Sequence, residues 1–353
     1  MRARGCVRSA VALAVALHGR FAPSAEIPCG ALAPARREAV RKATENLKIF
    51  FEREENRKAL GTDAVSIFLE LGETAVDSEL ARVAMEEARR LAAPLARTYA
   101  GTGGLDARDN LVGALSLLPD SRPLHLSRNS SLRLLSSVLS RLENREPDEA
   151  YYGARFDAAR LGALDADTLF NLLVDSYTVE RARVVFPGLP APGVGLGDVL
   201  RFALARPLAG LSSGDDGADD FYLATHVAYV LSDYSRLRLR AGDLGPVLPY
   251  LRAQVPRALA SRDTEASAEI ADVLRQTGAD DSDPDVCRLT RLLLLTQRTD
   301  GSWPRTDPED AYDVVHPTWV AVHGLRERFF LPGGAWALRV RALLGAAASA
   351  PGR

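Results

Sequence analysis

The sequence predicts an all-α fold, and two observations support this prediction. Almost every long segment has apolar residues at helical spacing and is rich in good helix formers, whereas strand signals are nearly absent. Short stretches with helix-stop and helix-start residues separate these segments. Because the segments recur in pairs several tens of residues apart, we expect a series of helical hairpins.

Seven helices are expected in chain order, and each is bounded by residues that end or begin a helix. They cover residues 34–54, 78–91, 130–142, 167–175, 199–206, 221–234 and 284–297. The breaks lie at 101–104, 120–123, 187–193, 212–217 and 278–284, and they contain Gly, Pro, Asp and Ser. The Pro-rich stretch 187–193 is the best candidate boundary, but hairpins lie on both sides of it. We therefore expect one domain over residues 34–353, preceded by an N-terminal helix or extension over residues 1–33.

Charge and composition exclude several classes of function. The chain has 353 residues, 47% of them hydrophobic, and a formal net charge of -2, with basic residues scattered among acids. This pattern gives no electrostatic case for a nucleic-acid partner. There is no P-loop, dinucleotide fingerprint or nucleophile elbow, which excludes the simplest NTPase, dinucleotide and serine-hydrolase interpretations. Beyond the N-terminus no segment approaches the roughly 20 apolar residues needed to span a bilayer, so we expect a soluble protein.

The cysteines and the N-terminus bear on the compartment. Cys6, Cys29 and Cys287 are few, far apart and odd in number, which argues against a disulfide framework and a Cys-rich zinc module and favours a reducing compartment. Residues 1–25 combine early arginines with a short apolar run, so they are either a secretory signal peptide or a first amphipathic helix. The shortness of that run favours the helix. We therefore expect a cytoplasmic protein.

A motif follows the last expected helix: Gln297-x-x-x-Gly301-x-Trp303, with Leu293 four residues before the Gln. The Gln297 amide can bond backbone groups left free at a helix end, and Gly301 permits a backbone reversal. Trp303 can then stack over the turn and join two helices. The motif resembles the second half of the QW repeat of squalene-hopene cyclases and their relatives, which implies an α/α toroid with a central cavity. The alternative is a helix, a Gly turn and a buried Trp without a true repeat.

The segment from Asp219 to Asp233 places polar residues inside an otherwise apolar helix. Four of them share one helix face because they are spaced by four, three and four residues. These residues are Tyr222, His226, Tyr229 and Asp233. On an inner helix of a toroid this face would look into the cavity. Alternatively, Asp219 and Asp220 cap the helix, while Tyr and His satisfy one another in the core.

A second polar segment runs from Tyr312 to residue 325 and contains His316-Pro317-Thr318-Trp319. It resembles the last zinc-ligand segment of protein prenyltransferase β subunits, and the resemblance implies that His316 is a ligand. Pro317 suits a first helical turn, which would place His316 near a helix N-terminus at the cavity mouth. The sequence departs from that family at the Asp-x-Cys pair, because Asp220-Phe221-Tyr222 has Tyr in place of Cys. A zinc site formed by Asp220, His226 and His316 and a simple helix-capping His316 both remain open.

A third segment, Asp165-Ala166-Asp167-Thr168, resembles the acid motif of class II terpene cyclases. The resemblance implies that Asp167 donates a proton, with Asp165 and Thr168 supporting it. Such an acid needs a raised pKa, which clustered carboxyls in an apolar cavity provide. The alternative is that Asp165 or Asp167 is a helix N-cap.

The leading hypothesis is a small-molecule biosynthetic enzyme, an isomerase or lyase similar to terpene cyclases, acting on an apolar, isoprenoid-like substrate. The expected catalytic residues are Asp167, Asp219 or Asp220 as the acid, and His226 or His316 to accept the last proton or orient the acid. The expected substrate-binding residues are Tyr222, Tyr229, Asp233, Tyr312 and Trp319, and the aromatic faces of Tyr222, Tyr229 and Trp319 would stabilise cations. The alternatives are a metal-dependent enzyme using His226 and His316, and a noncatalytic helical-repeat scaffold. The sequence identifies no cofactor, metal or oligomeric state.

Overall fold

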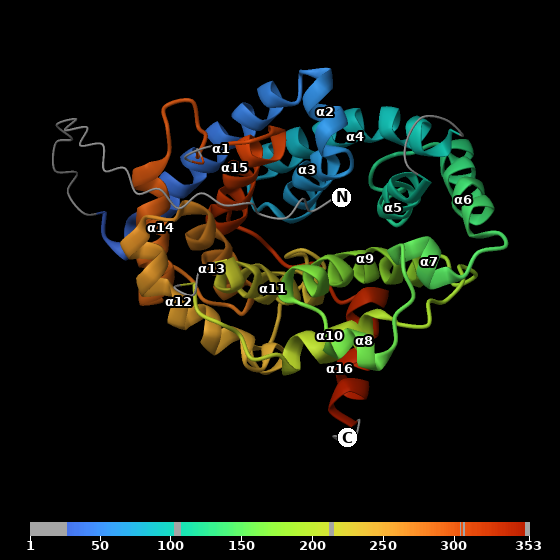
Figure 1. Ribbon diagram of the computed structural model, residues 1–353. Helices are drawn as coiled ribbons and strands as arrows, with labels where there is room; N and C mark the ends of the chain where they lie inside the picture. Colours follow the sequence, from blue (N-terminus) through green and yellow to red (C-terminus); the bar gives the residue numbers. More distant parts are fainter. Residues whose placement is uncertain (1–26, 102–106, 212–214, 304, 306–307, 350–353) are drawn as a thin grey trace.

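The computed structural model describes residues 27–101, 107–211, 215–303, 305 and 308–349, and across them it is all-helical (Figure 1). In the first half lie η1 (Cys29–Ala31), α1 (Leu32–Phe50), α2 (Glu54–Leu60), α3 (Asp63–Thr74), α4 (Ser78–Ala100), α5 (Ala107–Leu117), α6 (Arg128–Leu142), α7 (Pro147–Tyr152) and α8 (Ala158–Gly162). In the second half lie α9 (Ala166–Val185), α10 (Leu196–Ala205), α11 (Asp215–Leu231), η2 (Ala241–Leu244), α12 (Val247–Ser261), α13 (Thr264–Gln276), α14 (Pro284–Thr296), α15 (Ala311–Leu325) and α16 (Ala335–Ser349). Among the described residues there is no strand, and Ala75 and Arg328 form an isolated β-bridge.

All seven expected helices are present, and most differ from the prediction at their ends. The helix expected over 78–91 continues to Ala100, and the one over 167–175 continues to Val185, because no residue in either extension stops it except Pro94, which α4 accommodates. The break expected at 212–217 is partly wrong, since α11 already begins at Asp215. The helix that sequence analysis missed with most consequence is α13, which carries the candidate site described below.

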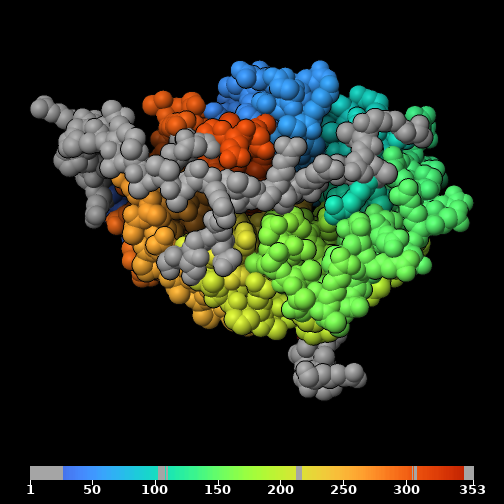
Figure 2. All heavy atoms as spheres, in the orientation of Figure 1, coloured from blue at the N-terminus to red at the C-terminus, as the bar shows by residue number. Residues whose placement is uncertain are grey.

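The long helices of the second half pack in an alternating order. Helices α9, α11, α13 and α15 form one row, in which each packs against the next, and α10, α12 and α14 pack against members of this row. The first helix, α1, packs against α14 and α15. In Figure 2 the blue atoms of the N-terminal helices accordingly adjoin the orange atoms of the C-terminal ones. Segments from the two ends of the chain therefore lie side by side.

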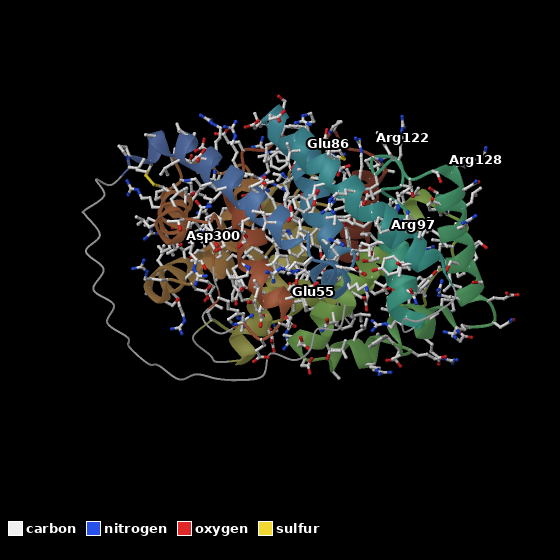
Figure 3. The ribbon with its side chains drawn as sticks, turned by 90° about the horizontal axis from the view of Figure 1, so that it is seen from above. Glu55, Glu86, Arg97, Arg122, Arg128 and Asp300 are labelled. Carbon is white, nitrogen blue, oxygen red and sulfur yellow. A yellow bond between two sulfur atoms is a disulfide. The ribbon has the colours of Figure 1, made fainter. Side chains whose placement is uncertain are left out.

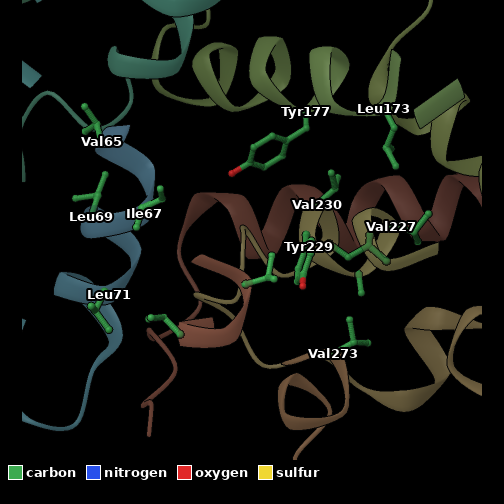
Figure 4. Packing of buried hydrophobic residues seen from close by; sticks show 14 of the residues in the cluster. Val65, Ile67, Leu69, Leu71, Leu173, Tyr177, Val227, Tyr229, Val230 and Val273 are labelled. Carbon is green, nitrogen blue, oxygen red and sulfur yellow. The ribbon is translucent and has the colours of Figure 1, made fainter. Parts of the chain in front are cut away.

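Helices α13 and α15 are deeply buried. Every residue of α13 from Ala266 to Gln276 is buried, and so are the residues of α15 from Val315 to Leu325 apart from Trp319. The two helices approach closely, because a Cβ added at Gly324 would lie 2.7 Å from the Ala268 carbonyl oxygen. Figure 4 shows Val273 of α13 below Tyr229 and Val227 of α11, in the same core cluster as the labelled side chains of α3 and α9. A buried helix with polar residues must place those residues among other helices.

The segment from Gln297 to Trp303 forms the expected structural clasp. The Gln297 side-chain amide donates to the carbonyl oxygens of Ala39 in α1 (2.8 Å) and Gly301 (3.0 Å). Gly301 has a φ of 89°, and a Cβ there would lie 2.5 Å from the Lys42 backbone. Trp303 is completely buried, and its indole N–H donates to the carbonyl oxygen of Leu293 in α14. The turn thus joins α14 to α1.

One prediction about the cysteines is corrected by a disulfide bond between Cys29 and Cys287. The cysteines are 258 residues apart in sequence, but η1 lies against α14, so their Cα atoms are only 5.5 Å apart. Figure 3 shows this bond in yellow beside the start of α1. Because disulfides persist in oxidising compartments, the cysteines no longer favour a reducing one. The expected signal peptide or amphipathic helix over residues 1–25, like Cys6, lies outside the described residues.

The surface carries charges of both signs, and Figure 3 shows Glu86, Arg97 and Arg122 extending from it. In the part of the chain that the structure describes, no helix combines the length and apolar character needed to cross a bilayer. Neither observation identifies a molecule that the buried polar residues would bind.

Candidate functional site

Two carboxyl groups of α13 converge on one histidine of α15. Glu265 and Glu269 are one helical turn apart and therefore lie on the same face of α13. The Nδ1 atom of His316 is 3.1 Å from Oε1 of Glu265, and its Nε2 atom is 4.0 Å from Oε1 of Glu269. We call these three residues the carboxylate–histidine centre. Each ring nitrogen of His316 thus faces a different carboxyl group.

Neighbouring aromatic residues fix the centre in place. The Tyr222 hydroxyl of α11 donates to Oε1 of Glu265 at 2.5 Å. The Tyr312 ring stacks on the His316 ring, with centroids 4.7 Å apart and planes 20° apart, and Trp319 meets the same ring edge-on at 5.7 Å. Because Tyr312 and Trp319 lie one turn before and after His316 on α15, the helix itself sets these contacts. The imidazole is therefore held between two aromatic rings and two carboxyls.

Glu265 and His316 form a buried ion pair. Burial alone would raise the pKa of Glu265, but the His316 charge and the hydrogen bonds from His316 and Tyr222 lower this pKa to about 2. Burial would lower the pKa of His316, but Glu265 and Glu269 raise it above the ordinary histidine value. At neutral pH Glu265 is therefore ionised, and its charge stabilises the protonated form of His316.

Glu269 has a different environment one turn away. Its side chain is completely buried, and among the described residues neither of its oxygens has a hydrogen-bond partner. The Thr225 hydroxyl is the nearest donor and lowers the pKa of Glu269 as a hydrogen bond would, but its own hydrogen bond with normal geometry goes to the Tyr222 carbonyl oxygen. Burial raises the pKa of Glu269 to about 8, with His316 opposing the rise. A buried carboxyl without a partner is rare and requires an explanation, such as a ligand, an ion or a catalytic role.

Other titratable groups surround this centre on every side. Asp63 at the start of α3 is near enough for its charge to act on His316, and burial raises the pKa of Asp63 to about 6. Asp263, the N-cap of α13, acts on Glu269, and Arg305 acts on Glu265. The His226 and His316 charges also interact. Groups from α3, α11, α13, α15 and the segment before α15 thus meet here.

A second polar group lies one to two turns further along the same helices. We call it the inner ion cluster, and it comprises Glu70, Asp272, His323, Arg326 and Arg328. The Trp319 indole N–H donates to Nε2 of His323 at 3.0 Å, and Oε2 of Glu70 is 3.3 Å from the same nitrogen. Burial raises the pKa of Glu70 to about 8, with the charges of Arg236 and Arg326 opposing the rise. Asp272 pairs with Arg328 and accepts a hydrogen bond from Ser235, which ties α13 to the segments after α11 and α15.

Comparison of the chain with protein-family models, curated proteins and solved structures gave no match. The chemistry of the carboxylate–histidine centre is therefore inferred from its residue types. Carboxyl and imidazole groups transfer protons, and both are also ligands for divalent metal ions. The rings of Tyr222, Tyr312 and Trp319 favour apolar or cationic groups beside them.

The structure brings several predicted site residues together. Tyr222 and His226 share one face of α11 with Tyr229, as their spacing predicts. The Nδ1 atom of His226 is 2.9 Å from the Tyr222 carbonyl oxygen, and its ring meets those of Phe170 and Tyr229 edge-on. Burial lowers the pKa of His226 to about 3, so this histidine is neutral. The predicted residues Tyr222, His226, Tyr312, His316 and Trp319 thus belong to one region.

Three predicted residues, Asp219, Asp220 and Asp233, lie outside this region. Asp220 accepts hydrogen bonds from the Arg206 side chain and the Ala209 N–H, so the zinc set of Asp220, His226 and His316 is not assembled. Asp219 precedes it within α11, and neither residue caps that helix, which begins at Asp215. Asp233 lies beyond the end of α11 with a φ of 53° and accepts from Tyr177 and Arg181 instead of continuing the helix face.

Asp167 and His316 also lie at positions other than those predicted. Asp165 is the N-cap of α9 and accepts from the Thr168 N–H, and Asp167 follows half-buried in the first turn. Burial and Asp165 raise the pKa of Asp167, with Asn171 opposing the rise. The prediction that His316 lies near a helix N-terminus is wrong. Asp310 caps α15 and lies seven residues before Pro317, which was expected to start the helix, so Pro317 lies inside it.

Sequence analysis missed both carboxyls of the centre. Glu265, Glu269 and Asp272 lie at spacings of four and three residues in 264–276, among apolar residues. That spacing is also typical of the solvent-facing side of an amphipathic helix. Sequence alone cannot show that α13 is enclosed on that side by α11 and α15. The sequence did contain one indication: a short helical segment with acidic residues on one face, two helices before the segment expected to carry His316.

Proposed function

We propose that this chain is an enzyme that transfers a proton to an apolar small molecule, as in the acid-initiated cyclisation or isomerisation of an isoprenoid-like substrate. The observation that carries the proposal is the position of Glu269, whose carboxyl group is buried without a partner and faces His316. Its raised pKa supports this assignment, because the group then holds its proton at neutral pH. Glu269 takes the role that sequence analysis gave to Asp167.

The neighbouring residues have separate roles in this proposal. Glu265 and Tyr222 orient His316 through its Nδ1 atom, which leaves Nε2 on the Glu269 side. Neutral His226 accepts the final proton from the substrate and releases it to solvent, while His316 returns a proton to Glu269 and takes a replacement from solvent, so each turnover leaves both histidines unchanged. The rings of Tyr312 and Trp319 lie where they can stabilise positive charge on the reacting carbon skeleton.

The packing order supports an α/α toroid as the frame of this site. Helices α9, α11, α13 and α15 supply inward-facing polar residues, and α10, α12 and α14 cover them. Contacts of α1 with α14 and α15 bring the first helix to the last pair, as closure of a ring requires. We include in the proposal that α3 and α5 continue the inner row, because Glu70 of α3 reaches His323 of α15.

Product analysis tests this function directly. The purified chain in EDTA is incubated with linear polyenes and polyprenyl alcohols of graded length, and with their terminal epoxides, and products are separated by gas chromatography with mass detection. We expect Glu269→Gln to lower product formation at least ~100-fold, the scale of general acid catalysis. Asp167→Asn is the matched control and should retain product formation within about threefold. Undiminished product from a folded Glu269→Gln protein would refute the role of Glu269.

A further inference from the structure

We propose that the carboxylate–histidine centre binds one divalent metal ion, held by Glu265, Glu269 and His316. The inference rests on the proposed function only for the location of the reaction centre. In this inference the electrophile is a bound cation, which takes the place of the proton on Glu269. The sequence resemblance implied His316 as a zinc ligand together with Asp220 and His226, whereas the present set replaces those two partners with Glu265 and Glu269.

The geometry of the three side chains suits a cation. One ligand atom from each residue can be chosen so that all three lie within 4.8 Å of one another. Oε1 of Glu269 and Nε2 of His316 face each other across 4.0 Å, which exceeds a hydrogen bond but is close to twice a metal–ligand bond of about 2.1 Å. An ion between them would contact both atoms, and the Glu265 carboxylate, which bonds the opposite ring nitrogen Nδ1, would turn towards the same ion to complete the set.

A second, independent observation points to a ligand at this place. Glu269 is completely buried, and among the described residues both of its oxygens lack hydrogen-bond partners although they face the charged His316. Glu265, by contrast, is already bonded to Tyr222 and His316. A cation satisfies the two free acceptors of Glu269, which no side chain of the described region does.

Charge balance favours a divalent ion over a monovalent one. Two ionised carboxylates and a neutral imidazole carry two negative charges, so a divalent cation makes the buried centre neutral. The ligand set contains two oxygens and one imidazole nitrogen and no sulfur, which suits Zn²⁺, Mn²⁺, Co²⁺ or Fe²⁺ better than Cu⁺. Tyr222 holds Glu265 from outside the ligand set, as outer hydrogen bonds do in metal sites. Three protein ligands leave a position for water or substrate.

Metal titration of the intact chain tests the inference without any substrate. Zn²⁺ and Co²⁺ are titrated into EDTA-stripped, dialysed protein by calorimetry, in two buffers with different ionisation enthalpies, and Co²⁺ binding is followed by its visible absorption. We expect one ion per chain, release of protons on binding, and affinity that weakens as the pH falls from 8 to 6. Glu269→Gln and His316→Gln should each weaken binding at least ~10-fold.

A matched control separates the centre from buried carboxyls in general. Glu70→Gln alters the other buried carboxyl whose pKa is raised to about 8, but Glu70 belongs to the inner ion cluster, so metal affinity should stay within about threefold of the parent. The inference is overturned if the parent binds neither ion at 1 mM, on the order of the weakest specific metal sites, or if folded Glu269→Gln binds as tightly as the parent. Product formation in EDTA that is lost in Glu269→Gln would uphold the proposed function while metal binding fails.

Discussion

Replacement of Glu265 by Gln and replacement of Glu269 by Gln are expected to change the stability of the protein in opposite directions. The two side chains are one turn apart on α13 and face one histidine, but the pKa of Glu265 is lowered to about 2 and that of Glu269 is raised to about 8. Replacement by Gln removes the charge and keeps the shape. We therefore expect Glu265→Gln to destabilise the metal-free protein at neutral pH and Glu269→Gln to stabilise it.

The magnitudes follow from linkage between protonation and folding. The pKa of Glu269 in the folded protein lies above the ordinary glutamate value of 4.5. The folded state therefore binds more protons than the unfolded state and loses stability as pH rises from 4.5 to 8. At about 1.4 kcal/mol per pKa unit, Glu269→Gln removes a cost of at most roughly 5 kcal/mol above pH 8 and little below pH 5. The folded pKa of Glu265 is depressed, so its contribution of roughly 3 kcal/mol is present above pH 4.5 and is lost as pH falls towards 2.

Urea unfolding in EDTA measures both effects. The parent and the two variants are unfolded at pH 5, 6, 7 and 8, and the free energy of unfolding is compared at each pH. The advantage of Glu269→Gln should grow by about 1 kcal/mol per pH unit across this range, whereas the loss in Glu265→Gln should stay nearly constant. If both variants lose stability equally, or if the Glu269→Gln difference does not change with pH, the assignment of one neutral and one ionised carboxyl is wrong.

Three further predictions concern the frame around the site. Cys287→Ser breaks the bond to Cys29, which closes a loop of 258 residues, and should lower the free energy of unfolding by up to ~5 kcal/mol; equal urea midpoints with and without reductant would contradict this. Gly301→Ala should cost more than about 2 kcal/mol because its Cβ would meet the α1 backbone, whereas Gly242→Ala, where that space is open, should change the urea midpoint little. Asp220→Asn should lower thermal stability by about 1–3 kcal/mol and leave Co²⁺ affinity unchanged, since Asp220 holds the loop after α10; a loss of affinity would return Asp220 to the site.

Local patterns predicted the helices and the clasp well, because their causes are local. Gln297, Gly301 and Trp303 act through a turn within seven residues of chain, and Gly301 needs its positive φ whatever surrounds it. The error in the start of α15 is also local: Pro317 suggested a first turn, but Asp310 offers a cap whose side chain accepts two backbone N–H groups. A strong cap outweighed the Pro signal.

The centre itself depends on contacts that local patterns do not contain. Glu265 and His316 are separated by 51 positions in the chain and meet because Gly324 lets α15 lie directly on α13. The disulfide has the same origin, since η1 reaches α14 only in the folded chain. Asp220 and Asp167 were good candidates by residue type, but Arg206 engages one and the first turn of α9 places the other at a half-buried position. Residue type predicted the chemistry, and packing decided which residues supply it.

The free energy of Glu269 is the strongest argument that this region has a function. A carboxyl that must stay protonated at pH 7 costs the folded state roughly 3 kcal/mol, against a typical total stability of 5–15 kcal/mol. An apolar residue of similar size at position 269 would avoid this cost and would pack against the neighbouring rings. Glu70 carries a similar cost and its Oε2 atom also lacks a hydrogen-bond partner, but the charges of Arg236 and Arg326 oppose the rise in its pKa, whereas at Glu269 the opposing charge is that of His316. Strongly perturbed, unpartnered groups of this kind concentrate at sites that bind or react. We propose that a proton to be donated or a metal ion to be held accounts for this cost at Glu269.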